Sequence, residues 1–136
     1  MPPVAEPDPR DRAGESETIL LVEGDDALRT VVVGMLERYG FSVLSAGNGA
    51  EALALFAHHA TDVDVLLTGI VLPDFGGPEL VEQLAARWIE PPVIYMSGYL
   101  APEVERRVTL SPRVRLLRKP FTFDTLVRAV REALER

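Results

Sequence analysis

The chain has 136 residues, no cysteine, and 21 acidic against 14 basic side chains, which give a net charge of −7. This length suits one domain with its own core, the lack of cysteine excludes disulfides and thiolate chemistry, and the acidic balance argues against a broad nucleic-acid surface. No apolar stretch approaches the roughly 20 residues that span a bilayer, and the N-terminus lacks the basic and apolar regions of a secretory signal. We therefore expect a cytoplasmic protein that binds neither nucleic acid nor membranes.

The first 17 residues differ in composition from the rest of the chain. They are rich in proline and charged residues and carry little that could be buried. Such a composition is typical of a flexible leader or linker. We expect the folded domain to cover residues 18–136.

From residue 18 onward, short apolar runs alternate with amphipathic stretches. The runs at 18–22, 41–46, 63–68, 93–96 and 114–117 are typical of strands that are covered on both faces. The stretches between them show helical spacing, with Asp25 or Asp26 and Asn48 as helix caps and Gly40 as a stop. Five strand–helix units in series predict an α/β fold with a parallel, doubly wound sheet and helices on both faces.

Ligands bind at the carboxyl ends of the strands in such sheets, so the residues found there matter most. An acidic cluster, a hydroxyl group and a lysine at this edge would suit Mg²⁺ and a phosphoryl group. Taken singly, each feature has a plainer interpretation, as an ion-paired lysine, a Ser-Gly turn or a glycine that serves the backbone. The residues that follow the predicted strands are Glu23, Gly24, Asp25 and Asp26 after the first, Gly69 after the third, Ser97 and Gly98 after the fourth, and Lys119 and Pro120 after the fifth.

In their order and spacing these motifs resemble those of the receiver domains of bacterial two-component response regulators. The resemblance implies a flavodoxin-like sheet of order 2-1-3-4-5 and a signalling module that is not an enzyme. It also implies that a histidine kinase transfers a phosphoryl group to an aspartate beside Mg²⁺. The matching stretches are ILLVEGD at 19–25, GAEAL at 49–53, LLTGIVLP at 66–73, GPEL at 77–80, YMSGY at 95–99 and RKPF at 118–121.

The motif match breaks at two positions. Gly69 stands where the resemblance places the phosphoacceptor aspartate, and Gly24 stands where it places the second acid of a pair that Glu23 begins. Ser97 and Lys119 match the hydroxyl and the lysine that contact the phosphoryl group. Glycine cannot form an acyl phosphate. We therefore predict a pseudo-receiver that has lost the phosphoacceptor.

The remaining acids offer at most a degenerate metal site. Glu23 and Asp25 are the candidate ligands, and we expect Mg²⁺ binding to be weak or absent and no other cofactor. Asp74 is either a weak neighbour of the metal or a turn residue. Leu116 stands where some receivers carry a switch aromatic, so that readout is expected to be absent or altered.

The expected partner is a histidine kinase or another signalling protein, with weak self-association as an alternative. Receiver domains commonly use the face of the fourth helix, fifth strand and fifth helix, and this face is predicted to be either a basic patch or an ordinary solvated surface. The chain suits the C-terminal receiver of a hybrid histidine kinase or a stand-alone receiver. The alternative function is a small-anion or ligand-binding module at Ser97 and Lys119. The arginines of the face are Arg106, Arg107, Arg113, Arg115 and Arg118.

Overall fold

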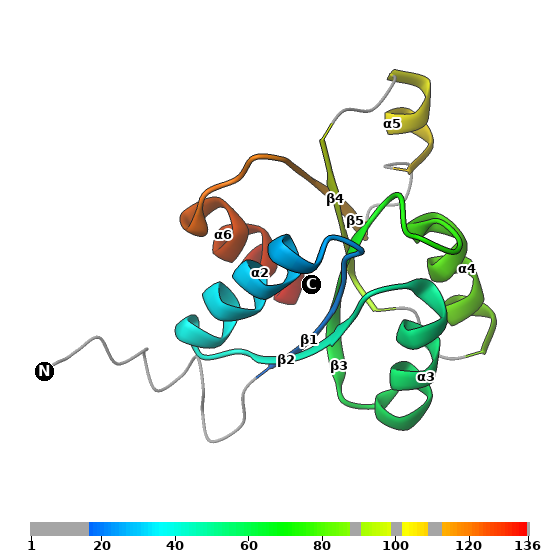
Figure 1. Ribbon diagram of the computed structural model, residues 1–136, viewed down its shortest axis with the longest axis horizontal. Coiled ribbons are helices and arrows are strands. Elements are labelled where there is room, and N and C mark those ends of the chain that lie inside the picture. The colour runs from blue at the N-terminus through cyan, green and yellow to red at the C-terminus, as the bar shows by residue number, and fades with distance from the viewer. Residues whose placement is uncertain (1–16, 88–90, 99–101, 109–112, 136) are drawn as a thin grey trace, which may run out of the picture.

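Five parallel strands form one sheet in the order β2-β1-β3-β4-β5 in the computed structural model, which describes residues 17–87, 91–98, 102–108 and 113–135. Helices α2 and α6 cover one face of the sheet and α3 and α4 cover the other, while α5 follows β4 (Figure 1). This architecture confirms the predicted fold and strand order. In chain order the elements are β1 (Thr18–Val22), α2 (Asp26–Tyr39), β2 (Ser42–Ala46), α3 (Gly49–His59), β3 (Val63–Gly69), α4 (Gly77–Arg87), β4 (Val93–Ser97), α5 (Pro102–Val108), β5 (Val114–Arg118) and α6 (Phe123–Leu134).

The apolar strands divide their side chains between two core layers. Along β1, Ile19 and Leu21 face α2 and α6, whereas Leu20 and Val22 face α3 and α4, and all four side chains are fully buried. Successive side chains of a strand point to opposite faces, so an unbroken apolar run is what a sheet covered on both faces requires.

Local signals set the helix ends as expected. The Asp25 carboxylate accepts a hydrogen bond from the Leu28 amide at 3.1 Å, and Asn48 accepts one from the Glu51 amide at 2.8 Å. Gly40 ends α2 with φ of 114°, a left-handed conformation that glycine adopts without the strain of a side chain. The predicted caps of α2 and α3 are therefore confirmed, with Asp25 as the α2 cap.

Three strands, β3, β4 and β5, run one residue further than the sequence predicted, to Gly69, Ser97 and Arg118. Gly69 pairs with Met96 in the ladder, and Ser97 pairs with Arg118, so each is the last residue of its strand instead of the first residue after it. Gly69 and Ser97 remain at the carboxyl edge of the sheet. The predicted leader at residues 1–17 lies outside the described residues except for Glu17, so it stays a prediction.

None of the helices formed by the described residues has the length and apolar character that a bilayer crossing requires.

Candidate functional site

The carboxyl edge of the sheet brings together the four residues that the sequence singled out most strongly. The Lys119 ammonium lies 3.5 Å from Glu23 Oε1, and the Lys119 amide donates to the Ser97 carbonyl at 2.7 Å. A Cβ built on Gly69 would lie 3.3 Å from the same Glu23 oxygen. Glu23, Gly69, Ser97 and Lys119 therefore form one site, contributed by the ends of β1, β3, β4 and β5.

Glu23 is held at every polar group that it carries. Its side chain is buried, with 5% of the residue exposed, and its Oε2 accepts a hydrogen bond from the Asp25 amide at 3.0 Å. Its Oε1 faces Lys119, its amide donates to the Ala46 carbonyl, and its own carbonyl accepts from Arg29 at 2.7 Å. A buried charge is costly unless it is paired and hydrogen-bonded, and these contacts meet that requirement. Both carboxylate oxygens of Glu23 are thus already engaged within the chain.

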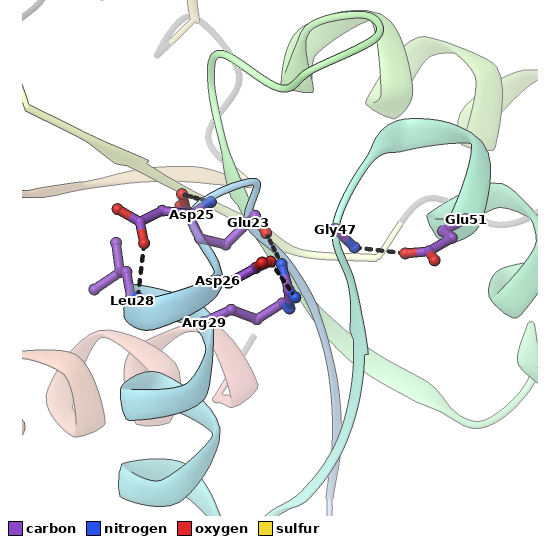
Figure 2. A network of polar contacts seen from close by, with 7 residues as sticks. All are labelled: Glu23, Asp25, Asp26, Leu28, Arg29, Gly47 and Glu51. Atoms are coloured by element: carbon purple, nitrogen blue, oxygen red, sulfur yellow. Dashed lines mark hydrogen bonds and ion pairs between the residues drawn. The ribbon is translucent and has the colours of Figure 1, made fainter.

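Arg29 braces the loop that carries Glu23, a role that was not predicted from the sequence. Its Nη1 donates to the Glu23 carbonyl and its Nη2 lies 2.6 Å from Asp26 Oδ1 (Figure 2). A Cβ on Gly47 would lie only 3.1 Å from Arg29 Nη1, so the guanidinium packs close to that glycine. The spacing of three residues between Asp26 and Arg29, which places the two side chains on one helix face, was the signal that could have revealed this contact.

The other two candidate acids have different partners. Asp25 caps α2 and is exposed. Asp74 accepts hydrogen bonds from the amides of Gly49 at 2.8 Å and Ala50 at 2.9 Å, where α3 begins, and from the Phe75 amide at 2.8 Å. Of the two interpretations of Asp74, these contacts support that of a turn residue, which joins the β3–α4 loop to α3.

The pKa of the Asp74 carboxyl reflects the same contacts. Desolvation raises the pKa, but the hydrogen bonds from the backbone amides of Gly49, Ala50 and Phe75 together outweigh it. The pKa therefore lies below its ordinary value of 3.8.

The carboxylates at this edge already have partners within the chain. Within the described ranges, no group of three or more histidine, cysteine, aspartate and glutamate side chains is placed to hold a metal ion. Mg²⁺ prefers six oxygen ligands, usually including one or two carboxylates. At this edge the buried carboxylate of Glu23 already binds a backbone amide and faces an ammonium group.

Two further residues, Pro73 and Gly77, shape the site, and no local sequence pattern indicated their roles. A Cβ on Gly24 would lie 2.9 Å from Cδ of Pro73, so the proline ring occupies the space beside this glycine. A Cβ on Gly77 would lie 2.3 Å from the Gly69 carbonyl oxygen, so α4 begins in direct contact with the backbone of β3. The contact of Pro73 with Gly24 joins segments that are distant in the chain, and the contact of Gly77 with Gly69 depends on the path of the loop between β3 and α4, so sequence spacing revealed neither.

The face formed by α5, β5 and α6 carries fewer unpaired charges than a basic patch would. Arg118 pairs with Glu105, and Arg115 lies 3.7 Å from Glu132 Oε1 while also donating to the Glu132 carbonyl. Arg106 and Arg107 are exposed on α5. The arginines of β5 therefore tie this strand to α5 and α6, and the basic surface is confined to part of the face.

A shallow hollow of about 380 Å³ lies between β5 and α6. Its lining residues are Val114, Arg115, Leu116, Leu117, Thr125, Arg128, Ala129 and Glu132.

Two curated relatives are similar to this chain in sequence over most of its length. The chain is 33% identical over 121 residues to the sensor kinase CckA of Brucella abortus, which covers 89% of this chain but only 13% of the kinase. It is 30% identical over 118 residues to the response regulator receiver protein CpdR of the same organism, which covers 85% of this chain and 95% of CpdR.

Solved structures agree with these relatives. The receiver domain of the hybrid histidine kinase CckA superposes with a TM-score of 0.74 at 31% identity, covering 86% of this chain and 98% of that domain. A two-component response regulator from Clostridium difficile gives a TM-score of 0.79 at 25% identity, covering 89% of this chain and 98% of the regulator. The family model of the response regulator receiver domain matches residues 19–131, which is most of the chain. The chain therefore belongs to the response regulator receiver domain family.

Proposed function

We propose that this receiver domain signals through protein contacts without being phosphorylated on an aspartate. The observation that carries the proposal is Gly69 at the end of β3, where the sequence motif of the family has its phosphoacceptor. An acyl phosphate needs a carboxylate nucleophile, which glycine lacks. The space beside Gly69 adjoins the ion pair of Glu23 and Lys119, so the domain has the surroundings of a phosphoryl site without the group that accepts the phosphoryl.

We also infer that Mg²⁺ binds weakly or not at all. Gly24 takes the place of one acid, and Glu23 has a backbone amide and an ammonium group as partners. Asp25 lies in the same loop, but its carboxylate caps α2. Lys119 neutralises the buried carboxylate of Glu23, a task that a cation would otherwise perform.

The partner in this proposal is a histidine kinase or another signalling protein that contacts the face of α5, β5 and α6. Arg106 and Arg107 supply exposed positive charge there, on a chain whose net charge is −7. Charge that is local and opposite to the net charge favours an acidic partner surface and makes the association rate depend on salt. Weak self-association through the same face is the alternative.

Two contexts fit the proposal, and in both we place the domain in the cytoplasm. The chain spans 13% of the sensor kinase CckA, which suits a receiver that is one domain of a hybrid kinase, and the C-terminal position remains the prediction from the sequence. It spans 95% of CpdR, which suits a stand-alone receiver.

The central test treats the chain with acetyl phosphate and Mg²⁺ and measures the intact mass. We expect no added phosphoryl group, because the site has no free carboxylate at position 69. Phosphorylation mapped to Asp25 or Asp74 would show that another acid accepts the group and would contradict the proposal.

A restored variant tests the same idea from the other side. Gly24→Asp with Gly69→Asp should gain Mg²⁺ binding and a phosphoryl mass, provided that the ring of Pro73 shifts from its position 2.9 Å from the new Cβ. The matched control is Gly24→Asn with Gly69→Asn, which adds the same volume without charge and should gain neither. If the Asp and Asn variants bind Mg²⁺ and gain phosphoryl mass to the same extent, the loss of the two carboxylates does not explain the inactivity of the site.

The partner face is tested by charge reversal. Arg106→Glu with Arg107→Glu should weaken binding to purified histidine kinases and reduce its dependence on salt. Arg38→Glu with Arg87→Glu, at exposed residues of α2 and α4, is the control with the same change in net charge. An equal loss of kinase binding in both variants would mean that the contact lies elsewhere or that binding depends only on the net charge of the chain.

A small anion bound at Ser97 and Lys119 is the second candidate function. The observation that favours it is the distance of 3.5 Å between Lys119 and Glu23, at the outer limit of a hydrogen bond, which leaves the ammonium group with donor capacity. Inorganic phosphate should then raise the melting temperature of the chain but not of Lys119→Met. An unchanged melting temperature would dismiss this second function and leave the first one standing.

A further inference from the structure

A hollow of about 420 Å³ opens between α2 and the loop that follows β5. Its volume falls within the range of about 300–1,000 Å³ that is usual for small-molecule sites. The hollow shares Lys119 with the carboxyl edge of the sheet, but Ser97 is not among its lining residues. Its walls are Leu28, Val31, Val32 and Met35 from α2 and Lys119, Pro120 and Phe121 from the loop.

The α2 wall is an apolar stripe that the chain itself leaves partly uncovered. The four residues follow the spacing i, i+3, i+4 and i+7, which places them along one side of the helix. Val32 is fully buried, but Leu28 and Met35 are only partly buried and Val31 is 52% exposed. Removing apolar side chains from water is favourable, so an apolar molecule seated on the stripe would be stabilised by covering it.

Among the described residues that line the hollow, Lys119 is the one that carries a charge. Its side chain is 32% exposed, and its ammonium group faces Glu23 at 3.5 Å. An ammonium group has three donors and no acceptor, so it can meet a second anion while it keeps this pair. Gly24 and Gly69 carry no carboxylate, so the nearby acids at this edge are Glu23, which pairs with Lys119, and Asp25, whose carboxylate caps α2. The hollow thus combines apolar walls with one ammonium group, which pairs with Glu23 and keeps donor capacity for a second acceptor.

We propose that this hollow binds a small amphipathic anion, a monocarboxylate with a hydrocarbon body. Its carboxylate pairs with the ammonium of Lys119, and its hydrocarbon body lies between α2 and Phe121. The inference shares Lys119 with the small-anion function proposed above and differs from it in requiring the hydrocarbon body of the ligand.

Decanoate, below its micelle concentration, is the probe for the full chain. Methyl NMR of Leu28, Val31 and Met35 reports the hollow, and calorimetry gives the affinity. Acetate has the charge without the body, and decanol has the body without the charge. We expect both to bind at least about ten-fold more weakly than decanoate, because charge-assisted contacts and apolar burial are each worth more than about 1.4 kcal/mol.

Two pairs of variants assign the contacts. Lys119→Met keeps the apolar stem, and it should weaken decanoate binding about ten-fold while leaving decanol binding unchanged. Unchanged decanol binding also shows that this variant is folded. Val31→Ala should weaken decanoate binding, whereas Val71→Ala, at a residue that is 85% exposed and outside the lining of the hollow, should not.

Three results would overturn the proposal. Equal affinity for acetate and decanoate would reduce the site to a bare anion contact. Equal affinity for decanol and decanoate would mean that the Lys119 ammonium does not contribute to binding in the hollow. Methyl shifts with an acidic amphipathic peptide but none with decanoate would make the hollow a protein interface.

Discussion

Gly24 and Gly69 lie at the same edge of the sheet, after β1 and at the end of the neighbouring strand β3, but their surroundings differ. A Cβ on Gly24 would meet the ring of Pro73 at 2.9 Å, closer than a Cβ normally approaches another atom. A Cβ on Gly69 would meet the end of the Glu23 side chain at 3.3 Å, and a carboxylate can move by a few tenths of an ångström. Neither glycine has a left-handed backbone, whereas Gly40 does. The place of one missing acid is therefore filled by a proline ring, and the place of the other remains open to a side chain.

The largest loss of stability is expected at Gly77. This position serves as the reference for a glycine that cannot be replaced because a backbone atom fills the place of its Cβ. In Gly77→Ala the new Cβ would lie 2.3 Å from the Gly69 carbonyl oxygen, and neither atom can move without displacing α4 from β3. We expect a loss of about 3 kcal/mol in the free energy of unfolding, at the upper end of the usual cost of overpacking. Urea denaturation measures it. A loss below about 1 kcal/mol would show that α4 can slide along β3, and the distances at Gly24 and Gly69 would then have little predictive value.

The next effect is expected at Gly24, where a side-chain ring and not a backbone atom is in the way. Gly24→Ala should cost about 1–2 kcal/mol in the free energy of unfolding, and adding Pro73→Ala should recover part of this loss. Gly34→Ala is the control, because no atom lies within 4 Å of its Cβ and it is exposed in the middle of α2. That change should stabilise the chain by about 1 kcal/mol through helix propensity. Additive losses in the double variant would mean that Pro73 does not close the Gly24 position.

Whether the sequence predicts a contact at the carboxyl edge of the sheet depends on how far apart the two contacting residues lie in the chain. Asp25, Gly40 and Asn48 act on amides and carbonyls within a few residues, so their cap roles were readable from the sequence. The order of strand-end residues likewise indicated that Glu23 and Lys119 meet, although 96 positions separate them. That inference worked because a parallel sheet brings all strand ends to one edge.

The contacts that the sequence did not predict are those between loops and their neighbours. Pro73 against Gly24 depends on the path of the β3–α4 loop, which no local propensity determines. Pairing of Arg118 with Glu105 depends on where the short helix α5 lies against β5. The extension of β3 to Gly69 depends on its partner Met96 in the ladder, since glycine has little preference for strands of its own. Tertiary pairing decides each of these details.

A smaller effect is expected at Gly69 and bears directly on the comparison. Gly69→Ala should change the free energy of unfolding by less than about 1 kcal/mol, because the nearest atom is the end of a side chain. The measurement is the same urea denaturation that is used for Gly24→Ala. A loss as large as that of Gly24→Ala would contradict the idea that this position is open, and Gly69 would then be a packing requirement.

The smallest effect concerns Asp74, which holds the β3–α4 loop and hence Pro73 in place. Because the folded-state pKa of Asp74 lies below its ordinary value of 3.8, the carboxylate contributes stability that is fully present above pH 3.8. That contribution is lost as the pH falls below 3.8 through the folded-state pKa. Asp74→Asn should therefore lower the stability slightly at pH 6, and the difference from the unmodified chain should narrow as the pH falls below 3.8. Asp62→Asn, an exposed aspartate for which no such backbone contact occurs among the described residues, is the control. A difference between Asp74→Asn and the unmodified chain that is constant across this range would mean that its charge is not what holds the loop to α3.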